Sequence, residues 1–186
     1  MPSITLWSIR WKFPVKLMKR ILVIGNAGAG KSTFARQLAE KTNLPLIHLD
    51  RLFWYGNWQQ RERTEFDALL QEALDKPEWI LDGNFSRTLP HRLQHCDTVF
   101  YFDIPTVTCL AGITQRVFSY WGKTRPDMGG NCPEYFDKQK PSLYKGVLTY
   151  NRRHRENYLR LLGSQNHAQV IIFKSRRQAV NYLSSL

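Results

Sequence analysis

The chain has 186 residues, of which 42% are hydrophobic and 13% aromatic, and its net charge is +12. This length fits one domain with a proper core, and the composition excludes general disorder. The three cysteines are odd in number and widely spaced, which excludes a disulfide framework and a four-cysteine zinc site and favours a reducing, cytoplasmic location.

Residues 1–17 differ from the rest of the chain. Three basic side chains interrupt them where a signal peptide needs an apolar stretch, and no apolar stretch of the chain approaches a membrane span. We expect residues 1–17 to be an extension outside a domain that covers residues 18–186. A basic, aromatic arm that contacts a membrane or nucleic acid is the alternative.

A glycine-rich turn follows the first predicted strand, residues 21–24. Residues 25–32 read GNAGAGKS and match the phosphate-binding pattern G-x-x-x-x-G-K-[ST], with a predicted helix over residues 32–41 directly after it. Glycines and a helix N-terminus together form a cradle for phosphate, Lys31 can reach the β- and γ-phosphates of ATP, and the Ser32 hydroxyl can ligate Mg²⁺. The residues predicted to bind the nucleotide are Gly25, Asn26, Ala27, Gly28, Ala29, Gly30, Lys31, Ser32 and Thr33.

Strands and helices alternate along the remaining chain. Further strands are predicted over residues 46–49, 79–81, 98–102 and 170–173, and helices over 61–74, 87–95, 106–120, 151–162 and 175–183. This alternation predicts an α/β fold, a parallel sheet with helices on both faces. Residues 122–148, rich in glycine, proline and charge, are expected to form an irregular lid that excludes water from the phosphate being transferred.

Two carboxylates compete for the metal. Asp82 ends the strand over residues 79–81 and opens the run DGNFSR, whereas Asp103 ends the more apolar strand TVFYF. Since Pro105 follows Asp103 closely, we interpret Asp103 as a turn or helix-capping residue and predict Asp82 as the Mg²⁺-associated carboxylate. Arg87 is predicted to hold a second phosphate.

The segment after residues 46–49 is a candidate acceptor site. Asp50 is expected at the same rim of the sheet, where it can accept a hydrogen bond from a substrate hydroxyl or amine. Phe53 and Trp54 can stack on a base or sugar, although aromatic side chains of this segment can equally fill the core. We interpret His48 as a structural residue.

Arginines gather in residues 115–186, which carry a net charge of +9. Arg116, Arg125, Arg153 and Arg155 are the catalytic candidates, because arginines that converge on a closed site stabilise a transferring phosphoryl group. We expect two or three of the arginines in this region to have that role. A solvated basic face, or contacts with DNA phosphates, would produce the same composition.

The order of these motifs resembles the adenylate-kinase-like group of P-loop kinases, and DGNFSR is similar to the DGFPR of adenylate kinases. The runs LDRLFW, WILDGNFSRT and GKTRPDMGGNCPE resemble the bacterial topology modulation protein (FlaR-like) family in particular. The resemblance implies a three-layer P-loop NTPase fold with sheet order 2-3-1-4-5. It also implies Lys31 and Ser32 at the phosphates, Asp82 near Mg²⁺, Arg87 at the acceptor, and Arg116 with Arg153 or Arg155 at the transferred phosphate.

We therefore expect an enzyme that transfers the γ-phosphoryl group of ATP to a nucleotide-like or other small acceptor. The alternatives are an ATP-binding regulator associated with nucleic acid and an ATP-binding module without turnover. The oligomeric state is left open by the sequence.

Overall fold

The computed structural model describes residues 18–136 and 140–186, so the expected extension over residues 1–17 lies outside the described residues. Five parallel strands form one sheet of order β2-β3-β1-β4-β5. The strands are β1 (Arg20–Gly25), β2 (Leu46–His48), β3 (Trp79–Asp82), β4 (Thr98–Phe102) and β5 (Gln169–Phe173). The predicted α/β class and the sheet order 2-3-1-4-5 are both confirmed.

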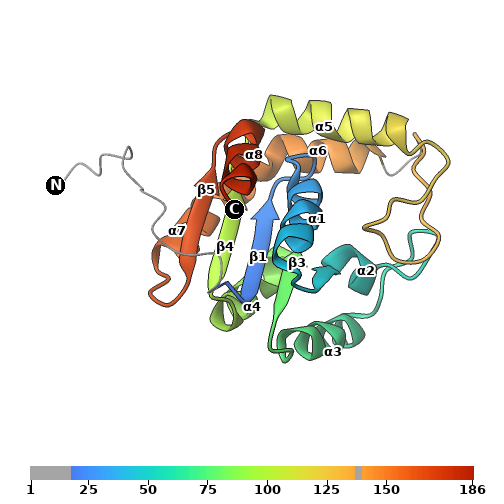
Figure 1. The fold of residues 1–186 in the computed structure, drawn as a ribbon. Helices are drawn as coiled ribbons and strands as arrows, with labels where there is room; N and C mark the ends of the chain where they lie inside the picture. The colour runs from blue at the N-terminus through green and yellow to red at the C-terminus, as the bar shows by residue number, and fades with distance from the viewer. Residues whose placement is uncertain (1–17, 137–139) are drawn as a thin grey trace.

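Helices cover both faces of this sheet (Figure 1). The side chains of Ile21 and Val23 pack with α1 (Lys31–Thr42), α5 (Thr106–Ser119) and α8 (Arg176–Ser184). Leu22 and Ile24 point to the other face, toward α3 (Arg63–Leu74), α4 (Leu89–His95) and α7 (Glu156–Gly163). Successive side chains of a strand point to opposite faces of the sheet, so β1 contacts both layers of helices.

Several element bounds differ from the expectation, and two of these differences concern the site. β2 ends at His48, because Leu49 already begins the short helix α2 (Leu49–Phe53). The interval 122–148 is not irregular throughout, since α6 (Lys140–Tyr150) occupies its last part and continues into a π-helical turn, η3 (Asn151–Arg155). α6 buries Val147 in the core, and packing of this kind favours a helix that local composition did not predict. A short 3₁₀ turn, η2 (Ser86–Thr88), precedes α4.

The remaining loop, residues 122–136, lies against the segment that follows α2 (Figure 1). The amide of Asn57 donates to the Asn131 carbonyl at 2.6 Å, and the indole of Trp58 donates to the Pro133 carbonyl at 3.1 Å. Arg51 Nε donates to the carbonyl of Pro126 at 3.1 Å. Two segments some 75 residues apart in sequence therefore form one continuous wall at the carboxyl edge of the sheet. Within the described parts of the chain, no helix has the length and apolar character needed to cross a membrane.

Candidate active site

The glycine-rich turn joins β1 to α1 at the carboxyl edge of the sheet. Gly28 adopts a left-handed backbone with φ of +76°, and a Cβ atom there would lie 2.2 Å from the carbonyl oxygen of Cys109 in α5. Only glycine fits this approach. The Lys31 ammonium donates to the Asn26 carbonyl at 2.9 Å, across the turn, and burial lowers the Lys31 pKa while the charges of Asp82 and Asp50 oppose that shift. The turn has the geometry that the phosphate-binding pattern predicts.

An arginine that the sequence analysis did not single out supports this turn from α8. Arg176 Nη2 donates to the Gly28 carbonyl at 2.6 Å, and Nε lies 3.4 Å from the Ala29 carbonyl. These bonds satisfy two carbonyls of the turn. A lone arginine after β5 carries no local signal for this contact, because it arises only when α8 folds back against the turn.

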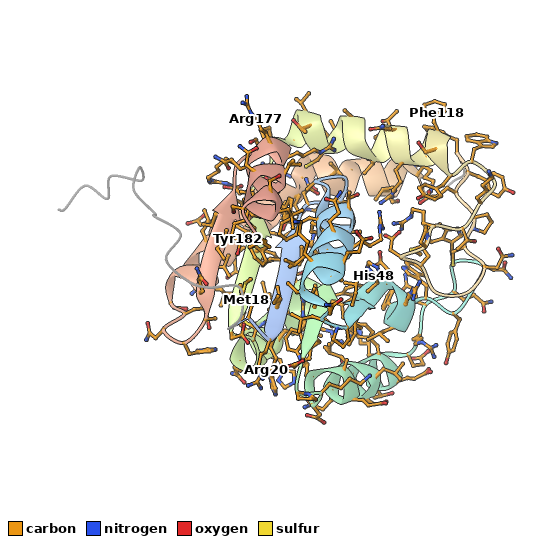
Figure 2. All side chains as sticks on the ribbon, in the orientation of Figure 1. Met18, Arg20, His48, Phe118, Arg177 and Tyr182 are labelled. Atoms are coloured by element: carbon orange, nitrogen blue, oxygen red, sulfur yellow. The ribbon has the colours of Figure 1, made fainter. Side chains whose placement is uncertain are left out.

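Asp82 ends β3 beside the turn, and its partner is His48 at the end of the neighbouring strand β2. The two residues are in register, and His48 Nδ1 lies 2.9 Å from Asp82 Oδ2, with both side chains about 6% exposed or less. Figure 2 labels His48 between α1 and α2. Burial alone would raise the pKa of Asp82, but the hydrogen bond from His48 and the charge of Lys31 outweigh it, so the net shift is downward. His48 therefore lines the cavity and holds the Asp82 carboxylate, so its predicted structural role is exercised inside the candidate site.

The second oxygen of this carboxylate fits a divalent cation. Asp82 Oδ1 is buried and has no hydrogen-bond partner among the described residues, and the Ser32 hydroxyl is near enough to contribute to the lowered pKa of Asp82. A carboxylate and a hydroxyl oxygen are the hard ligands that Mg²⁺ takes alongside phosphate oxygens. The predicted metal residues, Ser32 and Asp82, are therefore together and chemically suited to this ion.

A cavity of about 670 Å³ extends from the glycine-rich turn toward the loop 122–136. The predicted site residues that line it are Ala27, Gly28, Gly30, Lys31, Ser32, Thr33, Asp50, Asp82, Arg116 and Arg125. Its walls also include residues that were not predicted, among them His48, Asn84, Tyr120, Asp127 and Arg176. One cavity thus joins the phosphate cradle to the expected acceptor segment.

The part of the cavity wall that comes from α2, α5 and the loop 122–136 is rich in paired charges. Arg125 Nε donates to Glu134 at 2.9 Å, its Nη1 binds Asp127, and its Nη2 is 3.9 Å from Asp50 Oδ2. Arg116 approaches Glu134 only to 3.5 Å, and its Nε has no hydrogen-bond partner among the described residues. Arg125 is therefore largely neutralised by protein carboxylates, whereas the Nε of Arg116 lacks a hydrogen-bond partner in the described part of the chain.

Burial also changes the acid–base properties of this part of the cavity wall. Desolvation raises the pKa of Asp50, with a partial offset from the charge of Arg125, and desolvation lowers the pKa of Arg116. Asp50 is still 39% exposed, because it faces the open cavity. An accessible carboxylate with a raised pKa is suited to accept a proton.

Other predicted site residues lie elsewhere. Arg87 forms a two-pronged ion pair with Asp67 of α3 at 2.6 and 3.0 Å, and both side chains are about half exposed. Arg153 is exposed on η3 and does not line the cavity. Phe53 contacts Phe66 and Phe85, and Trp54 contacts Trp58, so these rings pack within the protein next to the cavity wall.

Asp103 is paired with two cations outside the cavity. Arg155 Nε donates to it at 2.9 Å, and Lys174 also binds it. Asp103 was predicted to be a turn or helix-capping residue; it lies in the connection between β4 and α5, but the N-cap of α5 is Pro105, so the capping alternative is wrong. Its role as an ion-pair partner explains why Arg155 is held away from the cavity, and Asp82 is the strand-end carboxylate that the cavity contains.

A parallel sheet of order 2-3-1-4-5, with a glycine-rich cradle between β1 and α1, defines the P-loop NTPase fold. Two solved structures share it: shikimate kinase from Acinetobacter baumannii in complex with shikimate, and shikimate kinase from Bacteroides thetaiotaomicron. Their TM-scores are 0.58 and 0.54 at 16% and 17% identity, over 92% and 90% of this chain and 96% and 95% of theirs.

Sequence comparison also points to P-loop kinases. Adenylate kinase from Thermotoga neapolitana is 28% identical over 89 residues, which cover 47% of this chain and 40% of that protein. Adenylate kinase from Clavibacter michiganensis is 26% identical over 109 residues, which cover 57% of this chain and 53% of that protein. Shikimate kinase from Azobacteroides pseudotrichonymphae is 38% identical over 77 residues, 34% of this chain and 44% of that enzyme. The chain spans about half or less of the length of these relatives, and no family model matches it. It is similar to the P-loop kinase group.

Proposed function

We propose that the protein transfers the γ-phosphoryl group of MgATP to a small acceptor that carries a hydroxyl group. The observation that carries this proposal is that one cavity is lined by Lys31 and Ser32 of the glycine-rich turn and also by Asp50 and Arg116. A phosphate cradle alone would suit any ATP-binding protein. A carboxylate and an arginine with spare donors across the same cavity suit a second substrate.

The donor half uses the glycine-rich turn. The backbone amides and the N-terminus of α1 would bind the phosphates, and Lys31 would leave its present bond to the Asn26 carbonyl to reach them. Ser32 and Asp82 Oδ1 would hold Mg²⁺, which when bound neutralises charge that develops on the phosphate oxygens. His48 fixes the other oxygen of Asp82, and Oδ1 is left without a hydrogen-bond partner among the described residues.

The acceptor half uses Asp50 and Arg116. Asp50 would accept the proton of the acceptor hydroxyl while that oxygen forms a bond to the γ-phosphorus and the bond to the β-phosphate oxygen breaks, which releases ADP. Arg116 would donate to the transferred group, because burial without a hydrogen-bond partner for Nε leaves it ready to do so. The wall formed by residues 122–136 would exclude water, so that transfer is favoured over hydrolysis.

The named relatives support an acceptor of nucleotide or small-molecule type, since they are adenylate kinases and shikimate kinases. An acceptor that combines a hydroxyl with an anionic group would match Asp50 and Arg116 together. The resemblance to the topology modulation family, a nucleic-acid partner and a cytoplasmic location stay predictions.

A phosphotransfer screen tests the proposal. Purified protein with MgATP is incubated with nucleoside monophosphates, nucleosides, and hydroxylated carboxylic acids, and phosphorylated products are detected by mass spectrometry with and without DNA. We expect a product with at least one acceptor, and Lys31→Ala should abolish it. ATP binding without any phosphorylated product, together with DNA-stimulated hydrolysis, would contradict transfer and favour the nucleic-acid regulator.

A further inference from the structure

Arg92 is a buried charge that the cavity itself does not explain. It lies in α4 and is 0% exposed, and none of the ion pairs found in residues 18–136 and 140–186 involves it. Burial lowers the pKa of Arg92 to about 10, so the guanidinium stays charged at neutral pH. A buried cation without a carboxylate partner is costly, and it persists only where hydrogen bonds satisfy its donors.

Three of the four acceptors of those donors belong to one short loop, residues 83–85. Nη1 donates to the Gly83 carbonyl at 3.0 Å, and Nη2 donates to the carbonyls of Asn84 and Phe85, the latter at 3.1 Å. Nε donates to the Thr88 hydroxyl at 3.2 Å. One planar guanidinium therefore fixes three successive peptide carbonyls, a task that a lysine ammonium with its single nitrogen cannot reproduce.

This loop needs to be held. Phe85 adopts a positive φ of 35°, a conformation that is unfavourable for a residue with a side chain and persists only when surrounding contacts impose it. The loop begins directly after Asp82, so its path sets the direction from which that carboxylate enters the cavity. Gly83, Asn84 and Phe85 themselves line the cavity.

The loop also reaches the phosphate cradle. Asn84 Oδ1 accepts a hydrogen bond from the amide of Gly25, the first residue of the glycine-rich turn, at 2.8 Å. The chain of contacts thus runs from Arg92 to the backbone of residues 83–85, then through the Asn84 side chain to Gly25. Arg92 contacts two parts of the nucleotide site through this loop without lining the cavity.

We propose that Arg92 is a positioning residue: it clamps the loop 83–85 so that Asp82 and the glycine-rich turn keep the spacing that MgATP requires. This inference rests on the proposed function for its ligand.

The first test examines the clamp in the protein without ligand. Arg92→Lys keeps the positive charge but loses the planar guanidinium with its several N–H donors. Leu93→Ala is the matched control, because Leu93 is the buried neighbour of Arg92 on α4 and its side chain packs in the core. Amide hydrogen exchange is followed by NMR at Gly25 and at Leu22 within β1. In Arg92→Lys, we expect the exchange rate of the Gly25 amide to rise about tenfold relative to that of Leu22, because the protection that one hydrogen bond gives is of about that size. In Leu93→Ala, we expect no such difference between the two amides. Equal changes at both amides, or the same pattern in both variants, would overturn the clamp.

The second test links the clamp to the nucleotide. MgATP affinity is measured by calorimetry for Arg92→Lys, Asn84→Ala and the double variant at a temperature where all are folded. Each single variant should weaken binding about tenfold, and the double variant should be little weaker than either, because both act through one contact chain. Independent additive losses, or unchanged affinity in both single variants, would overturn the positioning role.

The two tests keep this inference separate from the proposed function. Wild-type protein that binds no MgATP would refute the proposed function, while the exchange pattern at Gly25 would still support or overturn the clamp. If Arg92→Lys does not fold, Asn84→Ala breaks the same link from the other side. Normal Gly25 exchange and normal MgATP affinity in that variant would overturn the inference.

Discussion

Gly130 provides a sharp test of the wall formed by residues 122–136 and the segment after α2. Its backbone has a positive φ of 59°, and a Cβ atom there would lie 1.6 Å from the Tyr55 carbonyl oxygen. A side-chain rotation cannot relieve this contact, because a Cβ atom and a backbone oxygen make it. The loop must therefore move away from Tyr55 if Gly130 is replaced by alanine.

The magnitude follows from a comparison with Gly146, which lies exposed in α6 with no atom within 4 Å of its Cβ position. Gly130→Ala should destabilise the protein by at least about 1–2 kcal/mol, the cost of a left-handed backbone for an L side chain, before the clash is counted. Gly146→Ala should stabilise it by up to about 1 kcal/mol, because alanine is the better helix former. The unfolding free energies of the two variants should then differ by about 2–3 kcal/mol, and their melting temperatures by roughly 4–12 °C, since each kcal/mol shifts a domain of this size by about 2–4 °C.

Thermal unfolding followed by circular dichroism measures this difference. Amide exchange at Asn57, which donates to the Asn131 carbonyl, reports whether the wall has separated locally. Faster Asn57 exchange is expected in Gly130→Ala alone. Equal melting temperatures for the two variants, with unchanged Asn57 exchange, would refute the close approach of the two segments.

Three further predictions concern individual charges. Asp82→Asn should raise the Mg²⁺ concentration needed for half-maximal ATP turnover, and Asp103→Asn should leave it unchanged. A Mg²⁺ titration in which only Asp103→Asn raises that concentration would make Asp103 the metal residue. Asp103→Asn should instead cost about 1 kcal/mol of unfolding free energy at pH 7, a value kept small because Arg155 and Lys174 are about half exposed. Burial would raise the pKa of Asp103, but the bonds from Arg155 and Lys174 lower it overall, so this contribution is present above pH 4 and is lost as the pH falls through the lowered value. Urea unfolding of both proteins between pH 2 and 7 checks this, and a gap that widens in acid would contradict it. Arg87→Ala should change phosphotransfer less than Arg116→Ala does, because Arg87 is paired with an exposed carboxylate outside the cavity; initial rates decide, and a larger loss at Arg87 would restore it to the acceptor site.

Local sequence determined the framework of this protein. The turn GNAGAGKS between an apolar strand and an amphipathic helix is a local feature. The cradle consists of backbone groups of these consecutive residues, so its geometry depends on their own conformational preferences. The alternation of strands and helices predicted the parallel sheet for a similar reason, since crossover rules leave few arrangements. Asp50 and Asp82 were predicted at the correct rim because the carboxyl ends of parallel strands share one edge.

The tertiary structure decided which charges reach the cavity. Arg87, Arg116, Arg125 and Arg155 look alike in the sequence, yet Arg87 and Arg155 are held by carboxylates elsewhere, while Arg116 and Arg125 face the cavity. The partner of an arginine depends on which helices pack together, and no local pattern encodes that.

The same reason explains the residues that the sequence analysis missed. His48 contacts Asp82 because β2 and β3 are neighbours in register, and Arg176 supports the turn because α8 returns to it from the far end of the chain. The sequence around Arg92 is that of an ordinary helix and gives no sign of burial. Arg92 becomes a buried guanidinium with backbone partners only because α4 packs against the loop 83–85. Local sequence determined the phosphate cradle, whereas long-range packing selected the side chains that complete it, because packing brings together residues from distant parts of the chain.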